Sequence, residues 1–224
     1  MKRGRLVTLE GVDGAGTSTQ CALLAKALRQ RGFATHVTRE PSDGPIGVII
    51  RQVLARRVVV PGQTGPRPPR METMALLFAA DRVDHLESEI LPNLADGVTV
   101  ISDRYVHSSI AYQSLTAAGD QREALEWVKL VNSRARPPDC VLLLEVSPEE
   151  ASRRRMERGG REEIYDDKDL QRRLAAFYSE LPGRFPEHKI VVIDGEREIE
   201  EVHADCLRAA LGFLGEGPEC ENSV

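Results

Sequence analysis

A glycine-rich segment near the N-terminus has the residue types that bind phosphate groups. It reads Glu-Gly-Val-Asp-Gly-Ala-Gly-Thr-Ser-Thr over residues 10–19, between an apolar run and a helical pattern. Backbone N–H groups of such a turn and of the following helix N-terminus point at a bound anion. A triphosphate cradle requires Gly, four residues, Gly, Lys, then Ser or Thr. We therefore predict a nucleotide phosphate site at Gly11, Val12, Asp13, Gly14, Ala15, Gly16, Thr17, Ser18 and Thr19.

One residue departs from that pattern, because Thr17 stands where the Lys is expected. The Lys normally reaches the outer phosphates and offsets charge that develops during phosphoryl transfer. Three explanations remain open: another cation replaces it, the protein binds nucleotide with poor catalysis, or an original Lys has been changed. Ser18 is placed to put its hydroxyl on Mg²⁺ and Thr19 to lie near a phosphate oxygen. A plain glycine turn between strand and helix is the competing interpretation.

An arginine-rich segment offers replacement cations. Five arginines lie within residues 153–161, beside Gly159 and Gly160. A cationic helix end with a glycine hinge is typical of a mobile lid, whereas the neighbouring glutamates favour a solvated, salt-bridged face. We expect Arg153 and Arg154 to belong to such a face. The predicted phosphate-facing side is Arg155, Arg158 and Arg161.

A second group of residues suits a monophosphate acceptor. Phe78 and Arg82 are four positions apart in a helical pattern, so an aromatic ring and a guanidinium share one face. An apolar run at about 98–102 leads into Asp103, Arg104 and Tyr105, where open parallel sheets place their ligand-binding residues. A core Phe, a structural Asp–Arg pair and a buried Tyr are the competing interpretation. The other candidates at this rim are Arg39, Glu40, Ser108, Ser109 and Gln113.

Short β-rich runs alternate with helical patterns, which predicts an α/β fold with a parallel sheet and crossover helices. Strands are expected at about 5–9, 35–38, 98–102, 139–145 and 189–193. Helices are expected at about 18–31, 47–56, 72–94, 167–181 and 197–211, and two more within 107–135. Another helix is expected to start at Ser147, which would cap it, with Glu150 completing a capping box.

Bulk properties exclude several classes of protein. The 224 residues are long enough for one sizeable core. A net charge of −5 argues against nonspecific DNA binding, and no apolar run approaches membrane-spanning length. The four cysteines are scattered and form no CxxC pair, which predicts reduced thiols. We expect a cytoplasmic protein with no nucleic-acid or membrane partner.

Taken in order, these motifs resemble thymidylate kinase, a family of nucleoside monophosphate kinases with the P-loop NTPase fold. The resemblance covers about residues 4–211. It rests on segments 10–16, 38–41, 77–82, 103–105 with 108–113, and 136–139 leading into 142–146. The ordered set is highly specific, although each motif alone is weak.

The resemblance implies a three-layer fold, with a five-stranded parallel sheet, helices on both faces and a small lid at about 153–166. A single domain would cover 1–212, and 213–224 would form a flexible tail. The implied reaction transfers a phosphoryl group from ATP to dTMP with Mg²⁺, giving ADP and dTDP for dTTP synthesis. A homodimer is implied as well.

The resemblance also implies individual roles. Phe78 would stack on thymine, Arg82 and Arg104 would bind the dTMP phosphate, and Asp13 would bind the sugar 3′-hydroxyl. Tyr105 would lie where a ribose 2′-hydroxyl clashes, and Ser109 and Gln113 near the base edge. Ser18 and Asp103 would serve the metal, and Arg197 the ATP adenine. Some members carry a catalytic Arg at the position of Gly14, whereas others supply lid arginines, as Arg155, Arg158 and Arg161 would here.

Other interpretations of the function remain open. A kinase for another deoxynucleotide or a deoxynucleoside would share the phosphate site but need another base pocket. A non-catalytic or weakly active nucleotide-binding homologue is supported by Thr17 alone. That Thr can also be an engineered or sequencing change in an ordinary kinase.

Overall fold

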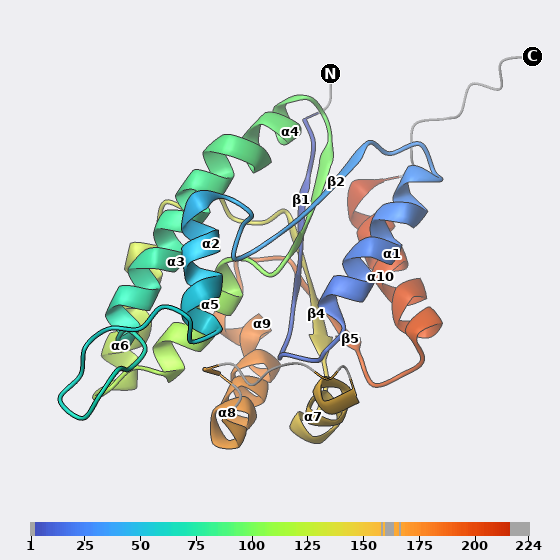
Figure 1. The fold of residues 1–224 in the computed structure, drawn as a ribbon. Helices are drawn as coiled ribbons and strands as arrows, with labels where there is room; N and C mark the ends of the chain where they lie inside the picture. The colour runs from blue at the N-terminus through green and yellow to red at the C-terminus, as the bar shows by residue number, and fades with distance from the viewer. Residues whose placement is uncertain (1–2, 158, 160–163, 166, 216–224) are drawn as a thin grey trace, which may run out of the picture.

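Five short apolar runs form a single parallel sheet in the computed structural model, which describes residues 3–157, 159, 164–165 and 167–215 (Figure 1). The predicted strands are confirmed, with boundaries that differ by one residue at most. They are β1 (Leu6–Glu10), β2 (Thr35–Arg39), β3 (Thr99–Asp103), β4 (Cys140–Glu145) and β5 (Ile190–Asp194), in the spatial order β2-β3-β1-β4-β5.

The central strands are covered on both faces. Every residue of β1 is buried, as are the first five residues of β4, whereas the edge strands β2 and β5 are partly exposed. Parallel sheets need helices on both faces, so their inner strands are nearly continuous apolar runs. This burial explains why residues 6–9 and 140–144 contain no charged side chain.

Helices on both sides of the sheet complete three layers (Figure 1). On one side lie α1 (Thr17–Arg29) and α10 (Ile199–Leu214), which pack against each other. On the other lie α3 (Met71–His85) and α5 (Val106–Leu115). Two helices pack outside them, α2 (Pro45–Leu54) on α3 and α6 (Gln121–Val131) on α5. Below the carboxyl ends of the strands lie α7 (Pro148–Glu157) and α8 (Lys168–Ser179), and α8 leads into α9 (Leu181–Arg184).

The long helix predicted at 72–94 is present but changes its winding. After α3, a π-helical turn η1 (Leu86–Ile90) leads into α4 (Leu91–Ala95). Pro92 lacks a backbone N–H, and its ring would clash with the carbonyl four residues earlier in a regular helix. A wider turn directly before Pro92 relieves that clash.

The start of α7 departs from the predicted capping box. Ser147 does cap the helix, since its Oγ accepts from the backbone N–H of Glu150 at 3.4 Å. The backbone N–H of Ser147, however, donates to Glu196 at 2.8 Å and not to Glu150. The Glu150 carboxylate binds Arg153 and Arg154 instead, because both lie within one turn of it. The β5–α10 loop is thereby tied to α7.

Two further expectations concern the chain ends and membranes. Because α10 continues to Leu214, residues 213 and 214 are helical and do not belong to a tail. Residues 216–224 lie outside the described part of the chain. Within the described residues, no helix has both the length and the apolar character to cross a lipid bilayer.

Candidate active site

The phosphate loop lies at the carboxyl end of β1, at the centre of the sheet. Its residues 11–16 connect β1 to α1, with Gly14 at φ +97°. A Cβ at Gly14 would lie 2.4 Å from the carbonyl oxygen of Ala151. Helix α7 therefore packs directly on the loop, and position 14 has no room for the arginine that some family members carry.

The first residues of α1 bring a hydroxyl to a carboxylate. Ser18 Oγ, in the first turn of α1, donates to Oδ2 of Asp103, the last residue of β3. Asp103 Oδ1 is buried and has no hydrogen-bond partner among the described residues. Mg²⁺ commonly binds through one or two protein oxygens, with waters and phosphates completing its shell. The pair therefore fits Mg²⁺, although the described residues contain no cluster of three metal-binding side chains.

Arg104 connects the phosphate loop to the neighbouring pocket. Its backbone is left-handed, with φ +68°, which is uncommon outside glycine. The guanidinium donates to the Gly11 carbonyl at 2.9 Å and to Ser108 Oγ at 3.0 Å, and it forms an ion pair with Asp13. One cation thus contacts both the phosphate loop and the start of α5.

Glu10 is a buried carboxylate that the sequence analysis did not single out. Its Oε1 accepts from the backbone N–H of Tyr105 at 3.0 Å, and its Oε2 accepts from Ser108 Oγ. Burial alone would raise the pKa of Glu10, but His107, the Ser108 hydrogen bond and Arg104 together lower it below 4.5. The ionised carboxylate therefore anchors the chain directly after Arg104. The sequence signal that could have identified Glu10 is an acidic residue at the end of an apolar strand, directly before a glycine-rich loop.

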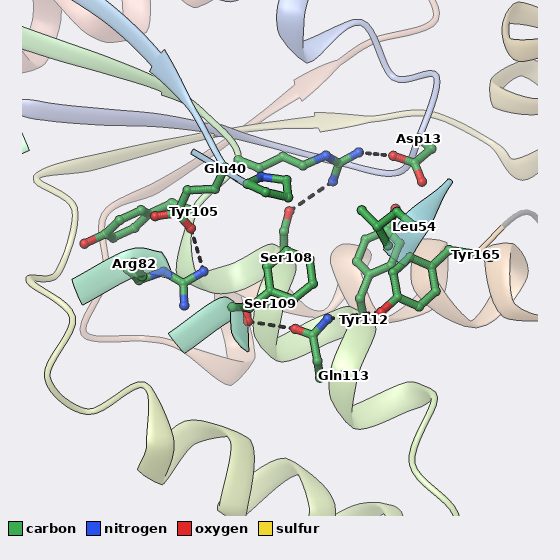
Figure 2. Close-up of a pocket in the computed structure, with 13 residues that line it drawn as sticks. Asp13, Glu40, Leu54, Arg82, Tyr105, Ser108, Ser109, Tyr112, Gln113 and Tyr165 are labelled. Atoms are coloured by element: carbon green, nitrogen blue, oxygen red, sulfur yellow. Dashed lines mark hydrogen bonds and ion pairs between the residues drawn. The ribbon is translucent and has the colours of Figure 1, made fainter. Parts of the chain in front are cut away.

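A pocket opens beside Arg104 and is lined by most of the predicted acceptor residues (Figure 2). It lies between the segments that follow β1, β2 and β3 and the helices α2, α3 and α5, and it includes both arginines predicted to bind phosphate. Its lining residues are Asp13, Glu40, Pro41, Leu54, Phe78, Arg82, Arg104, Tyr105, Ser108, Ser109, Tyr112, Gln113 and Tyr165.

Arg82 is almost fully buried at the inner wall of the pocket. Its Nη2 donates to Glu40 Oε2 at 2.6 Å (Figure 2), and its Nη1 donates to Asn132. The guanidinium carbon lies 5.4 Å from the centre of the Tyr105 ring. Arg82 Nε is buried without a partner among the described residues, so the guanidinium still has a donor nitrogen for an anion.

Three tyrosines line the pocket, and one of them, Tyr105, is a predicted site residue. Tyr105 is buried, and its hydroxyl donates to the carbonyl of Arg136 at 3.0 Å, so its ring lies behind Arg82. Tyr112 and Tyr165 line the same pocket, with ring centres 5.1 Å apart. Burial and the neighbouring Asp13 carboxylate raise the pKa of Tyr112 well above 10, so its hydroxyl stays protonated. Tyr112 could have been identified from the sequence, because it lies four positions after Ser108 and three after Ser109 and so shares their helix face.

The polar end of the pocket is formed by α5. Ser109 Oγ donates to Gln113 Oε1 at 2.7 Å (Figure 2), and the Gln113 amide lies 3.5 Å from the Tyr165 hydroxyl. Burial raises the pKa of Tyr165 to about 12. These groups present hydrogen-bond donors and acceptors in the same pocket as Phe78, a combination that suits a heterocyclic base.

Two predicted residues lie elsewhere. Arg39 is exposed, pairs with Asp43 at 2.7 Å and is not among the residues lining the pocket. Arg197 forms ion pairs with Asp205 and, at 3.5 Å, with Asp194. The segment after Arg197 nevertheless lies near α1, because Gln20 donates to the carbonyl of Ile199 at 3.0 Å.

The arginines of α7 divide between the phosphate loop and solvent. Arg155 donates to the carbonyl of Asp13, as predicted for the phosphate-facing side. Arg153 is exposed and paired with Glu150 and Glu157, as expected. Arg154 corrects the prediction, because its guanidinium reaches the Ala15 carbonyl at 3.5 Å while pairing with Glu150. The other two lid candidates, Arg158 and Arg161, lie outside the described residues.

Comparison with known proteins agrees with this geometry. A family model described as thymidylate kinase matches residues 9–206. A probable thymidylate kinase of Pyrococcus abyssi is 38% identical over 205 residues, covering 92% of this chain and 95% of that protein. One from Thermococcus kodakarensis is 39% identical over 213 residues, covering 94% and 98%. The thymidylate kinase of Ruegeria pomeroyi is 38% identical over 213 residues, covering 94% and 96%.

We predict that Glu10→Gln destabilises the fold in a pH-dependent way. Because the folded-state pKa of Glu10 is lowered, its charge stabilises the fold above its ordinary pKa of 4.5. That contribution is lost as the pH falls through the folded-state value. From pH 6 to 8 the variant should lose about 1.5–3 kcal/mol in free energy of unfolding.

Urea denaturation across a pH series measures this difference. The gap between wild type and variant should shrink below pH 4.5, while the exposed Glu123→Gln control stays close to wild type throughout. A gap that is unchanged at pH 3.5 would contradict the assignment of Glu10 as the ionised group.

Proposed function

This chain belongs to the thymidylate kinase family, and we propose that it transfers the γ-phosphoryl group of ATP to dTMP by direct in-line displacement, for dTTP synthesis. The contact of Arg104 with both the phosphate loop and the acceptor pocket carries this mechanism. An enzyme that transfers a phosphoryl group from one phosphate to another must hold the donor and acceptor in line. It must also neutralise the charge between them. The attacking phosphate is already anionic, so no general base is needed.

The acceptor pocket accounts for the parts of dTMP. The Arg82 guanidinium, with its unpartnered Nε, and Arg104 would bind the phosphate. Phe78 would stack on the thymine ring, and Ser109 and Gln113 would bind its edge. Asp13 would accept from the sugar 3′-hydroxyl, and Tyr105 would lie where a ribose 2′-hydroxyl clashes.

The donor side depends on the phosphate loop and on α7. Loop N–H groups and the start of α1 would bind the ATP phosphates. Ser18 and Asp103 would hold Mg²⁺, which supplies charge neutralisation on the phosphate oxygens when bound. Arg197 would contact the adenine only after leaving its acidic partners.

The positive charge missing at Thr17 would come from α7. Arg155 and Arg154 donate to carbonyls of the same loop, so their guanidinium groups already lie at its edge. Because Gly14 excludes a side chain there, an arginine from within the loop is not an alternative. We propose that these cations, with Arg104, stabilise the transferred phosphoryl group.

A coupled assay of ADP release tests the function directly. With MgATP and each nucleoside monophosphate, we expect turnover with dTMP at least about tenfold above any other acceptor. Thr17→Lys is compared in parallel. Strong wild-type turnover means that another cation replaces the Lys, whereas turnover only in the variant means a kinase disabled at position 17. Turnover with another nucleotide and none with dTMP would contradict the proposal.

The proposed cation replacement predicts unequal effects along α7. Arg155→Ala should lower kcat for dTMP about a hundredfold or more, because it removes a cation at the transferred group. Arg153→Ala is the matched control on the same helix, and its solvent-exposed pairs predict a change within about threefold. The same assay measures both variants. Equal small losses would show that α7 does not replace the Lys.

We also propose a homodimer that covers α2 and α3. Four large apolar side chains are exposed on these neighbouring helices: Val48, Ile49, Leu76 and Val83. A second copy of the chain would remove them from water.

Sedimentation equilibrium should find a dimer, and Ile49→Glu combined with Leu76→Glu should give a monomer. Ile199→Glu, at an exposed apolar site on α10, should remain dimeric. A monomeric wild type at micromolar concentration would contradict the proposal.

A further inference from the structure

A chain of buried polar side chains runs from Arg82 towards the outer edge of the sheet. Glu40 Oε2 accepts from Arg82 Nη2 at 2.6 Å, and Glu40 Oε1 lies 3.4 Å from His85 Nδ1. On its other side, His85 Nε2 lies 2.7 Å from Thr38 Oγ1 and 3.5 Å from Glu89 Oε2. His36, which is partly exposed, pairs with Glu89 at 2.6 Å.

The inner members of this chain are removed from water. The side chains of Arg82, Glu40 and His85 are 2%, 3% and 0% exposed. Buried polar networks are costly unless each member is satisfied, and an apolar core of the same shape is often as stable. Stability alone therefore does not account for an imidazole here, which directs attention to what the imidazole holds.

The two ring nitrogens of His85 have different partners. Nδ1 faces the Glu40 carboxylate, and Nε2 faces the Thr38 hydroxyl. If Nδ1 carries the proton, it donates to Glu40 while the Thr38 hydroxyl donates to Nε2, and the ring is satisfied. With Oε1 engaged by His85, the other Glu40 oxygen is directed at Arg82.

The orientation of Arg82 follows from these contacts. Each terminal nitrogen donates one N–H, to Glu40 or to Asn132, and Nε has no partner among the described residues. His85 is absent from the lining of the pocket, so its influence on a ligand must pass through Glu40 and Arg82. A donor that fixes Glu40 also fixes the direction in which Arg82 presents its remaining N–H groups.

We propose that His85 is a positioning residue for the acceptor phosphate, acting through the Glu40 carboxylate on Arg82. The inference rests on the proposed role of Arg82 as a ligand of the dTMP phosphate. The nitrogen that matters is Nδ1, because it faces Glu40, and the contact of Nε2 with Thr38 holds the ring in place.

Two amide substitutions separate the two nitrogens. In His85→Asn, the amide nitrogen lies near the place of Nδ1 and can still donate to Glu40. In His85→Gln, the amide lies near the place of Nε2 and can bind Thr38 but not Glu40. Both variants are uncharged and polar, and the larger Gln leaves the smaller void. A purely structural role of His85 therefore predicts that Gln is tolerated at least as well as Asn.

Calorimetric titration with dTMP tests the inference at equilibrium. We expect His85→Gln to weaken dTMP binding about tenfold, the effect of one charge-assisted hydrogen bond, and His85→Asn to stay within about threefold of wild type. In steady-state assays the KM for dTMP should follow the same order, while kcat and the KM for ATP stay within about threefold. Thymidine, which lacks the phosphate, should bind all three proteins alike.

Each contrary result has a separate meaning. Equal dTMP affinity of the Asn and Gln variants, or an equal loss for thymidine, would overturn the role of His85 alone. A wild type that binds thymidine but not dTMP would overturn the phosphate role of Arg82 and this inference with it. The thermal midpoint of each variant is measured in parallel.

Should His85→Gln fold poorly, Thr38→Val provides a second route, since it removes the hydroxyl that holds Nε2 and keeps the imidazole. We expect Thr38→Val to weaken dTMP several-fold, without an effect on thymidine. His36→Ala, at the outer end of the chain, is the control and should bind dTMP as wild type does. Full dTMP affinity in Thr38→Val would contradict the proposal.

Discussion

The ionised Glu10 carboxylate, buried at the end of the central strand, is the constraint on which the site depends. A buried charge must be neutralised by neighbouring donors. Glu10 meets this need by accepting from two donors, the backbone N–H of Tyr105 and the hydroxyl of Ser108. These donors fix the start of α5 against β1. Arg104, one residue earlier, is thereby held at the phosphate loop despite its left-handed backbone.

Both arginines of the acceptor pocket are oriented in advance by carboxylates. Arg82 is held by Glu40, and Arg104 is held by Asp13. Groups fixed before the reaction need no reorganisation when charge develops, which is the main source of electrostatic catalysis. Each guanidinium group thus has its own carboxylate partner in one pocket. Rigid pairs on strand ends and helix starts are therefore well suited to in-line phosphoryl transfer.

Much of the fold and site could be predicted because it depends on local pattern. The parallel strands follow from apolar runs, and the phosphate loop follows from glycine spacing. Nine predicted residues meet in the acceptor pocket because strand ends of a parallel sheet share one edge. How Tyr105 is held could not be predicted, because its hydroxyl donates to a carbonyl 31 residues away. Arg154 was assigned to solvent because nothing local places α7 on the loop.

By itself, the sequence determined the order of strands and helices, the phosphate loop with its Thr17 departure, and the residue types of the acceptor site. These features depend on residues within one or two turns of one another. Tertiary structure alone decided which carboxylate holds which arginine, which tyrosines face the pocket and which arginines of α7 reach the loop. Such contacts join residues that are from tens to more than a hundred positions apart in the sequence. Several partners of equal chemistry compete for each buried charge, and the packing of the fold decides which of them is in contact.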